Sequence, residues 1–205
     1  MPALEPLPGF WHNGGRLRVK EYAVKPLFAL FWQICRFRRG PEDVPFAPAL
    51  MAILLLAVAG LGSLSIVILS GVEQPRPEQD VAVSTQLMVQ WLALAAWLVV
   101  VYLLLQFKRM GSRFVQTATA ALGTDIVMAV PQFACFAIFA TQSPESALAA
   151  LGQFALLFVY VWDMLIKGHI YSHALNISRL QGNLLSLALS FGLFAISAAL
   201  VAPPQ

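Results

Sequence analysis

An acid and a base lie at a spacing suited to chemistry inside a long apolar run of the chain. Asp163 and Lys167 are four residues apart in the stretch YVWDMLIKGHIYSH, so on a helix they would share one face and could pair. An ionisable side chain in such a run is costly enough to suggest a function, here the binding of an ion or a proton. The spacing favours the alternative, which is a local ion pair near a membrane surface.

Two histidines follow on the same stretch and suggest a different chemistry. His169 and His173 are also four residues apart, so on a continuous helix they could hold a metal or a haem iron between them. The only other histidine, His12, is distant in sequence, and no Glu lies between the pair as it does in zinc hydrolases. We favour histidines at a membrane interface and expect no cofactor, with the metal site as the alternative.

A second acid precedes another apolar run. Asp125 follows Gly123 and Thr124, and an acid at this place would satisfy free backbone N–H groups at the start of a helix. We therefore expect Asp125 to cap that helix. The alternative is that Asp125, together with Asp163 and a kink at Pro131, lines a polar path for a transported substrate.

The elements that position these residues are membrane-spanning helices. The chain has 205 residues, of which 59% are hydrophobic and only 11% charged, whereas soluble domains carry about 25% charged residues. A helical span needs about 20 apolar residues. The sequence predicts an all-α bundle of five spans in residues 47–205, at Ala47–Ser70, Gln86–Phe107, Asp125–Thr141, Ser146–Ile166 and Asn183–Val201. Met1–Gly15 lacks the features of a removable signal peptide, so the first span should stay in the membrane.

The distribution of basic residues predicts the orientation. Of the 13 Lys and Arg residues, all but Arg76 lie before the first run, between the second and third, or between the fourth and fifth, where Lys167 and Arg179 are counted. Basic residues are retained on the cytoplasmic side, so the N-terminus should be cytoplasmic and the C-terminus outside. The net charge of +3 then reflects this bias and attraction to anionic lipid headgroups. No nucleic-acid partner is expected.

Residues 1–46 form a cytoplasmic segment with an amphipathic helix. Apolar residues recur at helical spacing in LFALFWQIC, with arginines at the end of this stretch. Such a helix lies in the membrane interface. The residues expected to contact lipid or a partner protein are Phe28, Phe31, Trp32, Arg36, Arg38 and Arg39.

Small residues at four-residue spacing predict close helix packing. Ala59 with Ser63, and Ala188 with Gly192, would let another helix approach. The neighbouring helix would belong either to the same bundle or to another membrane subunit. The chain has no nucleophile elbow, no phosphate-binding glycine loop and no carboxylates paired for acid–base chemistry, so we do not expect an enzyme.

Two segments resemble the Yip domain family of Ypt/Rab-interacting membrane proteins. They are GSRFVQTATAALGTDIVMAVPQ, Gly111–Gln132, and WDMLIKGHIYSHALNISRLQG, Trp162–Gly182. In addition, FRRGPEDVPFAPAL is similar to the start of short inner-membrane members from proteobacteria. The resemblance covers roughly residues 25–200 and implies five spans, a cytoplasmic N-terminus and a place in the bacterial inner membrane. Eukaryotic members are non-enzymatic organisers of membrane traffic that contact prenylated small GTPases and one another.

These observations leave three functional hypotheses. The first is a non-enzymatic inner-membrane protein that acts by association, either as an accessory subunit of a complex or as a membrane organiser. The second is a small transporter or channel that uses Asp163, and the third is a metal or haem protein that uses His169 and His173. An Asp163 paired with Lys167 at the headgroups would favour association, whereas an Asp163 facing a hydrated cavity would favour transport.

Overall fold

The computed structural model describes residues 24–70, 82–143 and 145–201, which form helices and contain no strand. The all-α fold is therefore confirmed for this part of the chain. The helices are α1 (Val24–Cys35), α2 (Pro48–Ser70), α3 (Val83–Phe107), α4 (Phe114–Thr141), α5 (Ala147–Ala174) and α6 (Arg179–Val201), with two short 3-10 helices, η1 (Pro41–Asp43) and η2 (Gly111–Arg113).

Helices α2 to α6 are the five that are long and apolar enough to cross a membrane. The chain is thus a multi-pass membrane protein, and the number of predicted spans is confirmed. Two predicted boundaries differ from the helix ends by more than two turns. Helix α4 begins at Phe114 and not at Asp125, and α5 continues to Ala174 and not to Ile166. Lys167, expected in a connection between spans, consequently lies inside α5.

Threonines explain why α4 is longer than the sequence suggested. The Oγ1 atoms of Thr117, Thr119 and Thr124 donate to backbone carbonyls about one turn earlier in the chain, at 2.8, 2.6 and 2.8 Å. All three side chains are buried. A hydroxyl that bonds back to its own helix presents little polarity to its surroundings. The stretch that looked like a polar connection is therefore compatible with a buried helix.

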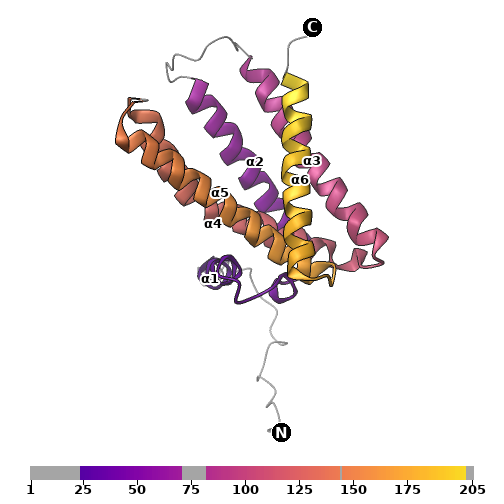
Figure 1. Cartoon of the computed structure of the whole chain (residues 1–205). Helices are drawn as coiled ribbons and strands as arrows, with labels where there is room; N and C mark the ends of the chain where they lie inside the picture. Colours follow the sequence, from indigo (N-terminus) through magenta and orange to yellow (C-terminus); the bar gives the residue numbers. More distant parts are fainter. Residues whose placement is uncertain (1–23, 71–81, 144, 202–205) are drawn as a thin grey trace, which may run out of the picture.

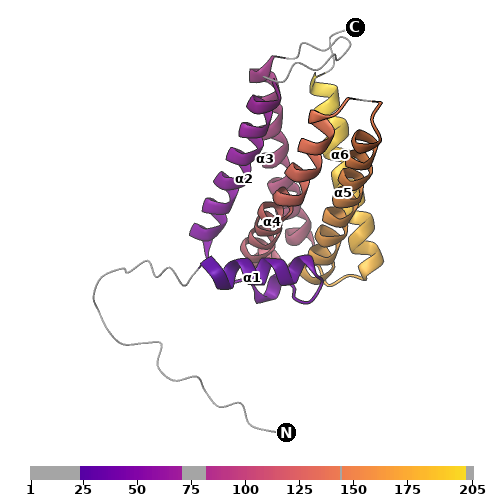
Figure 2. The ribbon, with the colours of Figure 1, turned by 90° about the vertical axis from the view of Figure 1, so that its left-hand side faces the viewer.

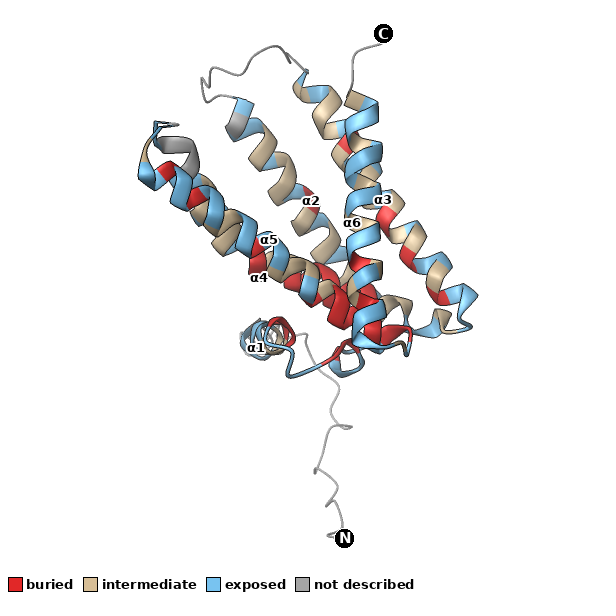
Figure 3. Ribbon diagram, in the orientation of Figure 1, coloured by how far each residue is buried: buried red, intermediate tan, exposed pale blue. Residues whose placement is uncertain are grey.

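The helices pack most closely at one end of the bundle. This end, here called the α1 end, carries α1 and the α3–α4 and α5–α6 connections (Figure 1). Helices α4 and α5 lie side by side along their lengths (Figure 2), while α2 and α3 diverge from them toward the opposite end (Figure 1). Buried residues gather at the α1 end (Figure 3). The largest fully buried apolar side chains are Ile34, Leu105, Leu122, Ile166 and Ile170.

Helices α5 and α6 touch backbone to backbone at a pair of glycines. A Cβ atom placed on Gly182 would lie 2.3 Å from the carbonyl oxygen of Gly168, and one placed on Gly168 would lie 2.8 Å from the Cα of Asn183. No side chain fits at either position. Close approach at small residues is the usual way in which membrane helices gain packing contacts, and the Ser186 hydroxyl adds a hydrogen bond of 2.9 Å to the carbonyl of Met164.

Helix α1 lies across the α1 end of the bundle and has two different apolar sides. Phe31, Ile34 and Cys35 are buried against α4 and α5, and the ring of Phe31 occupies the space in front of Gly123. The prediction that Phe31 contacts lipid or a partner is therefore wrong, because Gly123 leaves room for its ring inside the bundle. Phe28 and Trp32 point away from the bundle and are exposed.

Candidate functional site

Two acids and one base meet at the interface of α4 and α5. The Nζ atom of Lys167 lies 2.7 Å from Asp125 Oδ1 and 2.5 Å from Asp163 Oδ2. All three side chains are mostly shielded, with exposed fractions of 25% for Asp125, 14% for Asp163 and 18% for Lys167. We call Asp125, Asp163 and Lys167 the charge triad. The predicted Asp163–Lys167 pair is present, with a third member that the spacing did not reveal.

The prediction that Asp125 caps a helix is wrong. It lies eleven residues after Phe114, the first residue of α4, where backbone N–H groups already have partners within the helix. Its carboxylate instead accepts from Lys167 of the neighbouring helix. A sign of this role was available in the sequence, because a lone acid and a lone base in adjacent antiparallel spans can neutralise each other.

The charge triad is not neutral when every member is ionised. Two carboxylates surround one ammonium group, which leaves one negative charge in excess. Asp163 Oδ2 accepts from Lys167, but Asp163 Oδ1 is buried and has no hydrogen-bond partner among the described residues. A buried carboxylate oxygen without a hydrogen-bond donor is unfavourable. The electrostatic potential at the triad is therefore negative, and one of its oxygens lacks a donor.

The charge triad lines a groove between α2, α4 and α5. The groove has a volume of about 310 Å³, at the lower end of the roughly 300–1,000 Å³ of small-molecule sites. Its walls beyond the triad are mainly apolar and aromatic, with a few polar groups: Val58, Leu61, Gly62, Ser65, Ile126, Ala129, Gln132, Phe133 and Tyr160. Asp163 is thus paired with Lys167, as the association hypothesis expects, and it also lines a cavity, as the transport hypothesis expects.

Helix α1 covers the charge triad at the α1 end. The indole Nε1 of Trp162 donates to the carbonyl oxygen of Cys35 at 3.1 Å, which ties the end of α1 beside Asp163. Burial raises the pKa of the Cys35 thiol to about 12, and the nearby negative charges of Asp163 and Asp125 add to this effect. The thiol of Cys35 is fully buried.

The bundle holds residues 24–46 through buried side chains and also through hydrogen bonds to their backbone. Besides the contact from Trp162, His169 Nε2 donates to the carbonyl of Arg39 at 2.9 Å, and Gln116 Nε2 donates to the carbonyl of Val44 at 2.9 Å. We call residues 24–46 the strap. Carbonyls past the end of a helix lack partners within that helix, and the bundle supplies them.

The two histidines belong to this docking surface. Their ring centroids lie 4.5 Å apart in an edge-to-face arrangement, so the predicted shared face is confirmed. His169 bonds to Arg39, and His173 Nδ1 lies 2.9 Å from Glu42 Oε1 of the strap. Among the described residues, no group of three or more His, Cys, Asp or Glu side chains is placed to hold a metal ion. His12, the third histidine considered above, lies outside the described residues.

The small residues expected at helix contacts have different surroundings. Ala59 is buried and its carbonyl accepts from Gln90 Nε2 at 3.1 Å, so Ala59 packs inside the bundle, and Ser63 beside it is half-buried. Ala188 is exposed, and a Cβ placed on Gly192 would meet open space. The face of α6 that carries Ala188 and Gly192 is therefore not covered by any described part of this chain.

No known family model, curated protein or solved structure matches the chain. The resemblance to the Yip domain family therefore stays a prediction. Its two segments, residues 111–132 and 162–182, contain all three members of the charge triad and pack against each other in α4 and α5.

Proposed function

We propose that this chain is a non-enzymatic protein of the bacterial inner membrane that acts by association, as an accessory subunit or an organiser of a larger membrane complex. The observation that carries the proposal is the outward surface of the strap. Three large aromatic side chains are exposed there together with arginines, although other side chains of the strap are buried against the bundle. The three are Phe28, Trp32 and Phe46.

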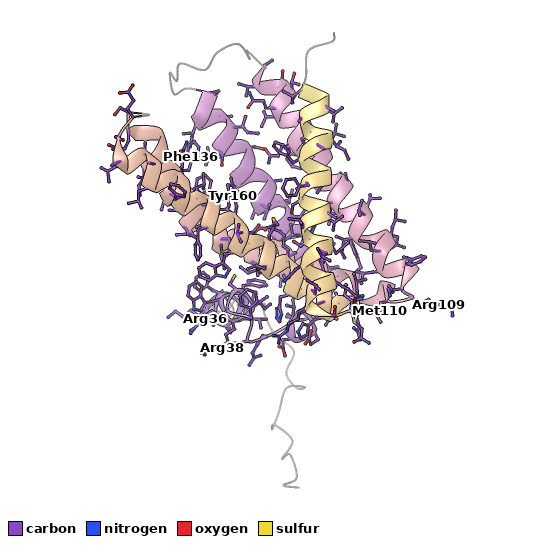
Figure 4. The ribbon with its side chains drawn as sticks, viewed as in Figure 1. Arg36, Arg38, Arg109, Met110, Phe136 and Tyr160 are labelled. Carbon is purple, nitrogen blue, oxygen red and sulfur yellow. The ribbon has the colours of Figure 1, made fainter. Side chains whose placement is uncertain are left out.

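The composition of this surface fits a membrane interface with anionic headgroups. Phe28 is 55% exposed and Phe46 is 63% exposed, and Arg36 and Arg38 lie at the same end of the bundle (Figure 4). Aromatic rings settle at the headgroup level, and each basic residue near an anionic leaflet contributes about 1 kcal/mol of attraction. The strap would thus lie along the inner leaflet, as expected for an interfacial helix.

Charge distribution supports a cytoplasmic location of the α1 end. Basic residues of the strap, of the α3–α4 connection and at the start of α6 lie at this end, whereas the described residues at the opposite end include no Lys or Arg. Retention of basic residues on the cytoplasmic side would place the N-terminus inside and the C-terminus outside.

The uncovered face of α6 offers a place for a partner helix. Ala188 and Gly192 leave room for a backbone to approach, as Gly168 and Gly182 do within the bundle. A helix of another membrane protein would pack there, and bulky side chains at these positions would prevent it.

The test is purification from the native membrane in lipid nanodiscs, followed by mass spectrometry of the proteins that co-elute. We expect a stoichiometric partner with the wild-type chain, and loss of that partner with Ala188→Leu combined with Gly192→Leu. Gly60→Leu is the matched control, because Gly60 on α2 also faces open space. A clean monomer or homo-oligomer, or a partner retained equally by both variants, would contradict the proposal.

A further inference from the structure

We propose that the groove between α2, α4 and α5 binds a small organic cation, an ammonium group attached to an apolar body, with the positive charge next to the charge triad. This inference goes beyond association and does not depend on it. It rests on the charge of the triad, the chemistry of the groove walls and the way in which the site is closed.

The charge of the site selects a cation. Asp125 and Asp163 together carry two negative charges and Lys167 carries one positive charge, so one negative charge is uncompensated when all three are ionised. Inside a bundle of low polarity this charge attracts a cation much more strongly than it would in water. Other described titratable groups near the triad are Cys35 of α1 and Tyr160 and Tyr171 of α5, none of which carries a positive charge.

The remaining elements around the triad leave this imbalance in place. The lining residues of α2 are Val58, Leu61, Gly62 and Ser65, none of which is charged. Helix α3 contributes Trp97, whose Nε1 donates to the hydroxyl of Tyr171 at 2.8 Å. Helix α6 contributes the hydroxyl of Ser186, which is already bonded to α5. Neither contact brings a positive charge to the site.

The walls of the groove select an organic cation over a metal ion. Lys167 already lies between the two carboxylates and contacts one oxygen of each, and the other oxygen of Asp163 is a buried atom. A metal ion would need several of these oxygens as direct ligands. An organic cation needs only the negative potential and an apolar wall. The ring of Tyr160, about one turn from Asp163 on α5, would attract the ammonium group, and the ring of Phe133, about two turns beyond Asp125 on α4, would contact the apolar body of the ligand.

The site is closed at the α1 end and narrow enough for a small ligand. Helix α1 covers the triad through Cys35 and its bond from Trp162, so a ligand would not enter from that end. A volume of about 310 Å³ accommodates a ligand of only modest size. Ala129 lines the groove beyond the triad, where a larger side chain would obstruct it without touching the charges.

The experiment is a calorimetric titration of the full-length protein in nanodiscs with benzyltrimethylammonium, with empty nanodiscs as the blank. Benzenesulfonate serves as a probe of similar shape and opposite charge. We expect saturable binding of the cation and none of the sulfonate. Asp163→Asn, which removes the excess charge, should weaken binding roughly tenfold or more, and Ala129→Leu should abolish it.

Two further variants make the outcome decisive. Phe133→Leu should weaken binding several-fold through loss of the aromatic contact with the apolar body of the ligand. Glu145→Gln, a change of an exposed acid in the α4–α5 connection, should bind like the wild type. Cation uptake equal to that of empty nanodiscs, equal affinity in the wild type and Ala129→Leu, or equal binding of the sulfonate would overturn the proposal. The titration uses the isolated chain, so its failure would leave the association proposal unaffected.

Discussion

The ammonium group of Lys167 on α5 lies 2.7 Å from the carboxylate of Asp125 on α4. This contact joins the two longest described helices, each of 28 residues, at a level where a span offers few other polar partners. The Asp163 carboxylate one turn earlier on α5 completes the arrangement. The three side chains therefore act as a unit, and changing one alters the environment of the other two.

Removal of the base should destabilise the bundle severely. Lys167→Met would leave two buried carboxylates facing each other without compensation, and breaking a buried pair from one side costs about 3–5 kcal/mol. Unfolding in mixed detergent micelles, followed by circular dichroism, measures this loss. Lys25→Met is the control, because Lys25 is exposed on α1 and should unfold like the wild type. An equal loss in both variants would contradict a stabilising role of the triad.

The glycines at the α5–α6 contact should not tolerate a methyl group. In Gly182→Ala the new Cβ would lie 2.3 Å from the Gly168 carbonyl oxygen, so the helices must move apart and lose packing, with an expected cost of about 1–3 kcal/mol. Gly192→Ala on the same helix meets open space and should be neutral or stabilising by up to about 1 kcal/mol. Paired unfolding curves of the two variants test this, and similar midpoints would refute the close contact.

Cys35 should resist alkylation while α1 is docked. Its pKa is raised to about 12 by burial and by the nearby carboxylates, so almost no thiolate exists at neutral pH, and reaction requires the thiolate. We expect slow labelling by N-ethylmaleimide in a Cys135→Ser background, with the rate rising only as the pH approaches the pKa. Trp162→Phe, which loses the bond to Cys35, should label faster. Rapid labelling of the parent protein would show that α1 does not cover the triad.

The strap should depend on anionic lipid through its exposed arginines. Arg36→Gln combined with Arg38→Gln removes two positive charges that make none of the docking contacts described above. At about 1 kcal/mol each, their loss should weaken contact with an anionic leaflet by about 2 kcal/mol. Hydrogen exchange of residues 24–46 should accelerate in anionic nanodiscs and remain unchanged in zwitterionic ones. Equal exchange in both lipids for the wild type would argue against a headgroup contact.

Composition and the length of the apolar runs were sufficient to predict the number of spans. They misplaced the starts and ends near polar residues. Threonine counts as a polar residue in a sequence, but the hydroxyls here bond to backbone carbonyls of the preceding turn. This holds for Thr117, Thr119 and Thr124. Likewise, Lys167 looked like the end of a span because its partner Asp125 lies 42 positions away on another helix.

The candidate site was predicted only in part, for the same physical reason. A spacing of four residues reveals pairs on one helix, as with Asp163 and Lys167 or His169 and His173. Contacts between helices depend on how those helices are packed. Neither the role of Asp125 nor the bonds from His169 and Trp162 to strap carbonyls leaves a periodic signal in the sequence.

The strap docks partly through the carbonyls of Cys35, Arg39 and Val44. Because these acceptors belong to the backbone, they depend little on which side chains the strap carries on its outward face. Exposed residues of the strap such as Phe28, Trp32 and Arg36 could be exchanged without removing these three hydrogen bonds. The residues to keep are the buried Phe31, Ile34, Cys35, Pro41 and Val44, together with Glu42, which contacts His173. The outward residues of the strap could therefore be replaced by those of a different amphipathic sequence. The membrane or partner that the strap contacts would then change, while the fold of the bundle would stay the same.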